Sequence, residues 1–104
     1  MTVLERRLKL QQLLEDTLGS RNVYFQPPEN FKMKYPAIRY QRGSINNVFA
    51  DDAIYNQKLS FELTVIDYDP DSEIVERVSK LPNCKFGTHY TADGLNHDTF
   101  TINY

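Results

Sequence analysis

Residues 54–67 have the sequence IYNQKLSFELTVID, and the alternation of their side chains decides the fold of this chain. The apolar members fall on one side of an extended backbone: Tyr55, Leu59, Phe61, Leu63 and Val65. The polar members fall on the other side: Asn56, Lys58, Ser60, Glu62 and Thr64. Because successive side chains of a β-strand point to opposite faces, this stretch predicts a long central strand with one buried face.

Shorter stretches of the chain also favour β-structure, because aromatic and branched residues occur there next to prolines or turn-forming residues. We expect these strands at residues 22–26, 36–42, 84–90 and 99–104. The last two should form a hairpin, because Ala92-Asp93-Gly94 between them favours a turn. Residues 43–52, with the sequence GSINNVFADD, are rich in turn-forming residues, and we expect a long hairpin loop there.

Two segments have the features of helices. Leucines recur at helical spacing over residues 2–18, with a threonine before them and a glycine after them as suitable caps. We expect these leucines to pack on the rest of the domain, because the heptads are too few for a coiled coil. A second helix is expected at residues 70–81, because Asp69 and Pro70 are typical of a helix start.

The expected order of elements is α-β-β-β-α-β-β, which fits the α+β class. We expect a mostly antiparallel β-sheet covered on one face by the two helices. The chain has 104 residues, enough for one domain and too few for two, so we interpret residues 1–104 as a single domain.

Composition and charge narrow the functional classes. The net charge is -2, which gives no general attraction to nucleic acid or anionic lipid. Residues 1–42 hold eight Lys or Arg and four Asp or Glu, whereas residues 43–104 hold four and ten. The single Cys84 and the charges among the first leucines indicate a protein without a signal peptide, kept in a reducing interior. No apolar run approaches the ~20 residues that span a bilayer, so we expect no membrane insertion.

The acidic residues Asp67, Asp69 and Asp71 alternate as at the start of a calcium-binding loop. The glycine and closing glutamate positions of that loop hold Ser72 and Val78 instead. We therefore interpret these carboxylates as the end of a strand and the cap of a helix.

A second polar cluster comprises Cys84, His89, Asp93, His97 and Asp98. It has neither the CxxC pair nor the HxxxH helix pair of zinc sites. The chain also has no serine in a glycine elbow and no phosphate-binding glycine loop. We expect no catalytic residue, no metal and no cofactor.

A small nucleic-acid-binding protein or metal-dependent nuclease is the alternative hypothesis. The run from Phe31 to Arg42 mixes basic and aromatic residues, a combination that neutralises phosphates and stacks bases. A nuclease would use Glu62, Asp67 and Asp69 as its carboxylates. In a net acidic protein, a solvated loop and edge strand explains the basic run more simply.

Apolar residues in polar loops favour an assembly protein over an enzyme, because they suggest a surface that a partner covers. We predict that the loop at residues 43–52 is a contact between subunits, with opposite charges at its base. The predicted contact residues are Arg39, Arg42, Ile45, Val48, Phe49, Asp51 and Asp52. In a head-to-tail assembly, each subunit uses one surface to meet a different surface of its neighbour.

Five segments of the chain together form a distinctive series: residues 24–29 (YFQPPE), 35–40 (YPAIRY), 49–51 (FAD), 63–72 (LTVIDYDPDS) and 91–98 (TADGLNHD). In this order they resemble the small tail terminator or tail completion proteins of long-tailed bacteriophages and prophages. The resemblance spans nearly all of the chain after the first helix. None of these segments encodes a catalytic residue.

This resemblance implies an antiparallel sheet with helices packed on it and a structural role in the virion. It implies a six-membered ring at the head-proximal end of the tail tube, which ends tube polymerisation and offers a surface to the head connector. The expected partners are further copies of the chain, the tail tube protein and connector proteins, with DNA only as passing cargo. The expected location is the neck of the virion, after assembly in the bacterial host cytoplasm. Other neck proteins share this size and construction.

Overall fold

The computed structural model of this chain describes residues 2–51 and 53–104, and of residues 53–56 it describes the backbone only. In chain order the elements are α1 (Val3–Leu18), β1 (Val23–Phe25), β2 (Ala37–Ala50), β3 (Ala53–Asp67), α2 (Glu73–Ser79), β4 (Cys84–Ala92) and β5 (Leu95–Asn103). The expected α+β class and the order α-β-β-β-α-β-β are confirmed.

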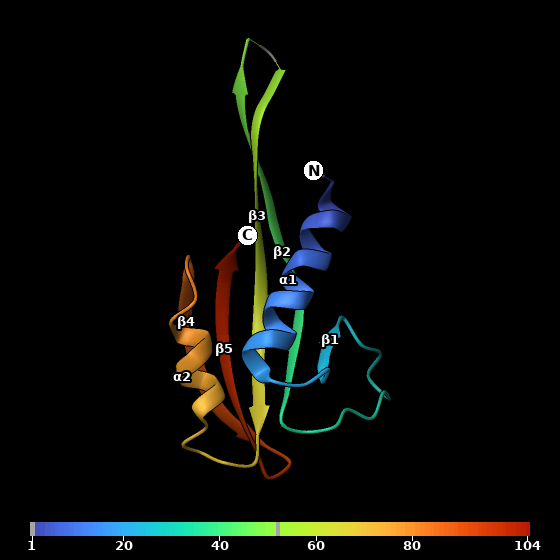
Figure 1. Ribbon diagram of the computed structural model, residues 1–104, viewed down its shortest axis with the longest axis vertical. Coiled ribbons are helices and arrows are strands. Elements are labelled where there is room, and N and C mark those ends of the chain that lie inside the picture. Colours follow the sequence, from blue (N-terminus) through green and yellow to red (C-terminus); the bar gives the residue numbers. More distant parts are fainter. Residues whose placement is uncertain (1, 52) are drawn as a thin grey trace.

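The strands form one sheet in the order β1-β2-β3-β5-β4, in which every neighbouring pair is antiparallel except β1 and β2. Both helices cover the same face of this sheet (Figure 1). We call this face the helix side and the other face the open side. The turn between β4 and β5 consists of Asp93 and Gly94, both with positive φ, which suits a tight hairpin.

The core lies between the helices and the central strand. Leu59, Phe61, Leu63 and Val65 are at most 1% exposed, which confirms the register predicted for this strand. The helices contribute five buried residues to this core: Leu10, Leu14, Leu18, Ile74 and Val78. Tyr55 and Asn56, which belong to the same predicted alternation, lie outside the described side chains.

The start of α2 differs from the expectation that Asp69 caps a helix beginning at residue 70. The helix begins at Glu73, and the hydroxyl of Ser72 caps it by accepting a hydrogen bond from the N–H of Ile74 at 3.2 Å. The Asp69 carboxylate instead accepts a hydrogen bond from the N–H of Asp71 at 2.9 Å. A local turn of this kind competes with helix formation, so the carboxylate shapes the approach to the helix and does not cap it.

The prediction of a hairpin loop at residues 43–52 is wrong. β2 continues through this segment to Ala50, and β3 begins at Ala53, so only residues 51 and 52 connect the two strands. The long β2–β3 hairpin extends far beyond the other strands (Figure 1). The described molecule measures 52 × 25 × 22 Å as a result.

Candidate functional site: a projecting arm

The described part of the hairpin that leaves the sheet comprises residues 44–51 and 53–58, which we call the arm. β1 pairs with β2 only as far as Tyr40, and β5 pairs with β3 only as far as Ser60. Beyond these points the described strands give the arm no neighbour on either side. Unpaired edges invite another chain to add, and a two-stranded hairpin alone is marginally stable in water. The arm is therefore suited to contact with a partner.

A β-bulge at the root of the arm decides which side chains share its faces. Gly43 and Ser44 together oppose the single residue Ser60, and pairing resumes with Ile45 opposite Leu59. The Ser60 hydroxyl accepts a hydrogen bond from the N–H of Ser44 at 2.8 Å, which satisfies the donor that the bulge releases. A side chain at residue 43 would meet the Ser60 oxygen atom Oγ at 2.7 Å, so glycine fits this position best.

The bulge places Ile45 on the helix side, because Ile45 pairs with the core residue Leu59. A second register shift separates Val48 from Phe49, which pairs with Ile54 near the tip. Ile45 is 41% exposed and Phe49 is 64% exposed. Val48 is also exposed and lies on the open side. These are the apolar residues that the sequence placed in a partner surface, and the structure gathers them on one projecting element.

The charged residues of the predicted contact are arranged differently from the expectation. Arg39 lies on the open side opposite Thr64, whereas Arg42 lies on the helix side opposite Phe61. Asp51 lies at the tip of the arm, so it does not face these arginines at a common loop base. The reason is that the intervening residues form a strand of about 20 Å instead of a closed loop. Asp52 lies outside the described residues.

Several contacts hold the root of the arm to the body. The Arg6 guanidinium of α1 donates a hydrogen bond to the backbone oxygen of Gln57 at 2.6 Å. Two residues further along β3, the N–H of Tyr104 donates to the backbone oxygen of Leu59 at 3.0 Å. The arm therefore projects from a fixed base.

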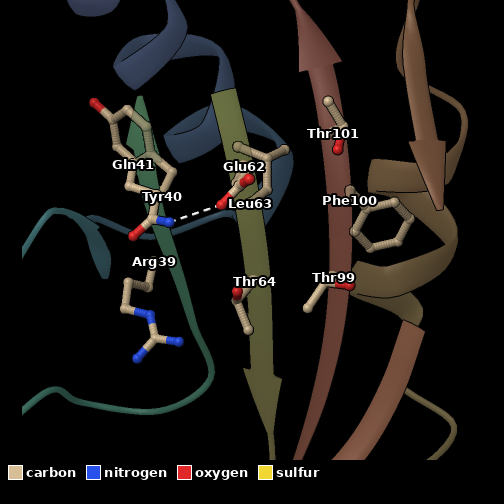
Figure 2. A pocket seen from close by; sticks show the side chains of 9 residues that line it. All are labelled: Arg39, Tyr40, Gln41, Glu62, Leu63, Thr64, Thr99, Phe100 and Thr101. Carbon is tan, nitrogen blue, oxygen red and sulfur yellow. Dashed lines mark hydrogen bonds between the residues drawn. The ribbon is translucent and has the colours of Figure 1, made fainter. Parts of the chain in front are cut away.

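The open side of the sheet holds a shallow polar depression of about 310 Å³ (Figure 2). Arg39, Gln41 and Glu62 lie beside a row of threonines on β3 and β5, and the Gln41 amide donates to the Glu62 carboxylate at 2.7 Å. The Glu62 carboxylate therefore has a hydrogen-bond partner within the protein.

The carboxylates of the nuclease hypothesis are not brought together. Glu62 lies on the open side in the middle of β3, whereas Asp67 is five residues further along, about 16 Å away in an extended strand. The Asp67 carboxylate accepts a hydrogen bond from the N–H of Asp69 at 3.1 Å. Within residues 2–51 and 53–104, no group of three or more His, Cys, Asp or Glu could hold a metal ion.

The second polar cluster of the sequence is also divided. His89 and Asp98 form a hydrogen-bonded pair at 2.9 Å across β4 and β5, and the Asp98 side chain is largely buried. His97 stacks instead on Tyr90, with ring centroids 4.7 Å apart. Cys84 lies at the opposite end of β4, and burial raises the pKa of its thiol, so the thiolate is disfavoured.

The basic and aromatic run from Phe31 to Arg42 does not form one surface. Tyr40 is buried under α1, where its hydroxyl donates to the side-chain oxygen of Gln11 at 2.5 Å. Burial raises the pKa of the Tyr40 phenol, against the opposing effect of the Arg7 guanidinium. Arg39 and Arg42 lie on opposite faces of the sheet.

Residues that sequence reasoning missed lie around the root of the arm. A groove of about 480 Å³ follows the edge of β3 where β5 ends, and Arg6, Lys58 and Tyr104 line it. A second groove of about 390 Å³ shares Tyr104 with it and is lined by Leu13 and other residues. We call these two grooves together the socket. Its residues come from five separate segments of the chain, so no local sequence pattern indicated it.

Comparisons with known proteins leave the family of the chain open. No protein-family model matches it, and no curated protein sequence matches it significantly. None of the helices in the described residues is both long and apolar enough to cross a membrane.

Proposed function

We propose that this chain is a structural virion protein of the tail terminator or tail completion class. In this role it forms a ring at the head-proximal end of a phage tail tube, ends tube polymerisation and joins the tail to the head connector. The ring would be a hexamer, as the resemblance of the sequence implies. The observation that carries the proposal is the arm, because its exposed apolar residues and unpaired strand edges suit contact with another subunit.

Two further features support this proposal. The fold that the resemblance implies, an antiparallel sheet with helices packed on it, agrees with the sheet and the two helices of this chain. Phe49 of the arm also belongs to one of the sequence segments that carry the resemblance. A protein that caps a tube needs a surface that remains accessible until assembly, and a projecting hairpin provides one.

The test is the polymerisation of a tail tube protein encoded in the same gene cluster as this chain. Electron microscopy measures the lengths of tubes grown with and without the protein. We expect shorter tubes with a ring at one end. Tubes of unchanged length without ring density would contradict the proposal, and binding to a connector protein alone would indicate another neck protein. Binding to single-stranded DNA that weakens steeply with salt would favour the nucleic-acid alternative.

The variant Phe49→Asp should lose this capping, because it places a charge in the apolar surface of the arm. Tyr68→Asp is the matched control, because Tyr68 is an exposed aromatic residue outside the arm, with an exposed fraction of 67%. We expect the Tyr68→Asp protein to cap tubes as the unchanged protein does.

A further inference from the structure

We infer that the tip of the arm in one copy inserts into the socket at the arm root of a second copy. This contact would identify the surface of the neighbouring subunit that the arm meets in the proposed ring. The inference rests on the proposed function only for the biological role of the contact. It depends on three observations: the shape of the socket, the distribution of charge and the reach of the arm.

The socket has a basic part and an apolar part. Arg6 and Lys58 line the first groove, and Leu13, Pro82 and Tyr104 line the second. The two grooves are adjacent, because residues from the end of β5 and from the segment before β4 line both of them. Their volumes of about 480 and 390 Å³ are large enough for an aromatic side chain.

The tip of the arm has the complementary composition. Among the described apolar side chains of the arm, Phe49 is the most exposed, and the acidic Asp51 follows it by two residues. Phe49 can bury its ring in the apolar part of the socket, while Asp51 approaches Arg6 and Lys58. Opposite charges on the two surfaces favour this orientation over the contact of two arm tips, which would bring like charges together.

The reach of the arm requires that the socket belong to a second copy. The socket lies at the root of the arm, beside Lys58, whereas Phe49 and Asp51 lie about 10 and 17 Å further along the strands. A straight hairpin cannot fold back to its own root. A contact between two different surfaces is heterologous, so repetition of it produces a closed ring or an open filament.

Each contact of this kind buries little surface, because only a hairpin tip enters a shallow groove. Stable interfaces bury about 1,200–2,000 Å² in total. A single contact should therefore be weak, and closure of a ring should strengthen the assembly because each subunit is then held at two places.

The experiment is disulfide cross-linking of the protein alone at high concentration, in a Cys84→Ser background. One protein carries Ala50→Cys beside Phe49, and another carries Asn103→Cys at a position that lines both grooves of the socket. We expect a cross-linked dimer when the two proteins are mixed and oxidised, and none from either protein alone. A single chain with both cysteines should give a ladder of multimers.

The matched control pairs Ala50→Cys with Thr91→Cys, an exposed position at the far end of β4. No cross-link is expected there. Cross-linking of Ala50→Cys with itself would show contact between two arms. Absence of the mixed dimer would show that the arm does not enter the socket. Either result overturns the inference. Because no tube protein is present, this outcome is independent of the tube-capping test.

Charge exchange gives a second, independent readout. Asp51→Lys or Lys58→Asp alone should lower the yield of the mixed dimer by about tenfold, which corresponds to about 1.4 kcal/mol. Asp51→Lys on the arm protein mixed with Lys58→Asp on the socket protein should restore the yield. Failure of this restoration, with both proteins folded by circular dichroism, contradicts the proposed pairing.

Discussion

The β2–β3 and β4–β5 hairpins contain the same kind of β-bulge but have different positions in the molecule. In the β4–β5 hairpin, Gly87 and Thr88 together oppose Thr99, whose hydroxyl accepts a hydrogen bond from the N–H of Thr88 at 2.8 Å. A side chain at residue 87 would meet the Thr99 oxygen atom Oγ1 at 2.6 Å. This hairpin lies alongside β3, with β5 paired to it over residues 60–67 of β3.

In the β2–β3 hairpin, the equivalent bulge at Gly43 and Ser44 marks the point where the strands leave the sheet. The bulge chemistry is the same, so it does not determine whether a hairpin projects. The difference lies in the neighbours, because β1 ends at Phe25 and β5 ends at Asn103. The described strands β1 and β5 therefore do not extend beside residues 44–50 of β2 and the facing part of β3, and the exposed residues of the arm follow from this.

The largest effect that distinguishes the body from the arm should come from Phe61. Phe61 is fully buried in β3, so Phe61→Ala should lower the free energy of unfolding by about 3–5 kcal/mol. Glu62→Ala, one residue further on the open side, should change it by about 0.5 kcal/mol or less, apart from the loss of one exposed hydrogen bond. Urea denaturation measures both, and equal losses would show that the strand register is wrong.

The two bulges offer a direct comparison of the hairpins. Gly87→Ala should lower the free energy of unfolding by about 1–3 kcal/mol, because the added methyl group displaces the hydroxyl of Thr99 in β5, which is paired on both sides. Gly43→Ala should cost less, because the arm beyond it can shift without breaking contacts to other strands. Thermal unfolding checks both variants. A larger loss for Gly43→Ala would mean that the arm is part of the cooperative body.

Within the body, the cap of α2 should have a moderate effect. Ser72→Ala removes the hydroxyl that caps the helix and should lower the free energy of unfolding by about 0.5–2 kcal/mol. Asp69→Ala is the matched control and should cost clearly less, since its carboxylate bonds only within the preceding turn. If chemical denaturation gives the reverse order, the helix is capped from Asp69.

A smaller effect is expected from the pH dependence of Tyr40. Its phenol has a raised pKa in the folded chain, so above about pH 10 the unfolded chain releases a proton that the folded chain keeps. Stability from this residue is complete below that pH and falls as the pH approaches the folded pKa. In the Tyr40→Phe protein, this part of the decline in stability with rising pH should be absent. Parallel slopes of stability against pH for both proteins would show that Tyr40 does not titrate differently on unfolding.

The sequence predicted the body of the molecule better than the arm, for a physical reason. In the body, one face of β3 is buried, so Leu59 to Val65 show a clear period of two. In the arm, exposed residues extend along both faces, and Gly43, Ser44 and the asparagines have the composition of a loop. The apolar Ile45 and Phe49 were correctly identified as exposed, but their placement depends on a bulge that composition does not reveal.

The socket was not predicted, because it depends on where separate segments end. Arg6 comes from α1, Lys58 from β3 and Tyr104 from the residue after β5.

The exposed Leu4 and Leu8 differ from the expectation that the leucines of α1 pack on the domain. Among the leucines of this helix, the buried ones are Leu10, Leu14 and Leu18.

The most direct test of the arm as a contact between copies is amide hydrogen exchange in the dilute and the assembled protein. We expect the amides of residues 44–50 to exchange rapidly in the dilute protein and at least about tenfold more slowly after assembly. The β4–β5 hairpin should show equal protection in both states. Phe49→Asp should keep the dilute pattern and the melting temperature at all concentrations. Equal protection of residues 44–50 before and after assembly would contradict the contact and make the arm a purely structural hairpin.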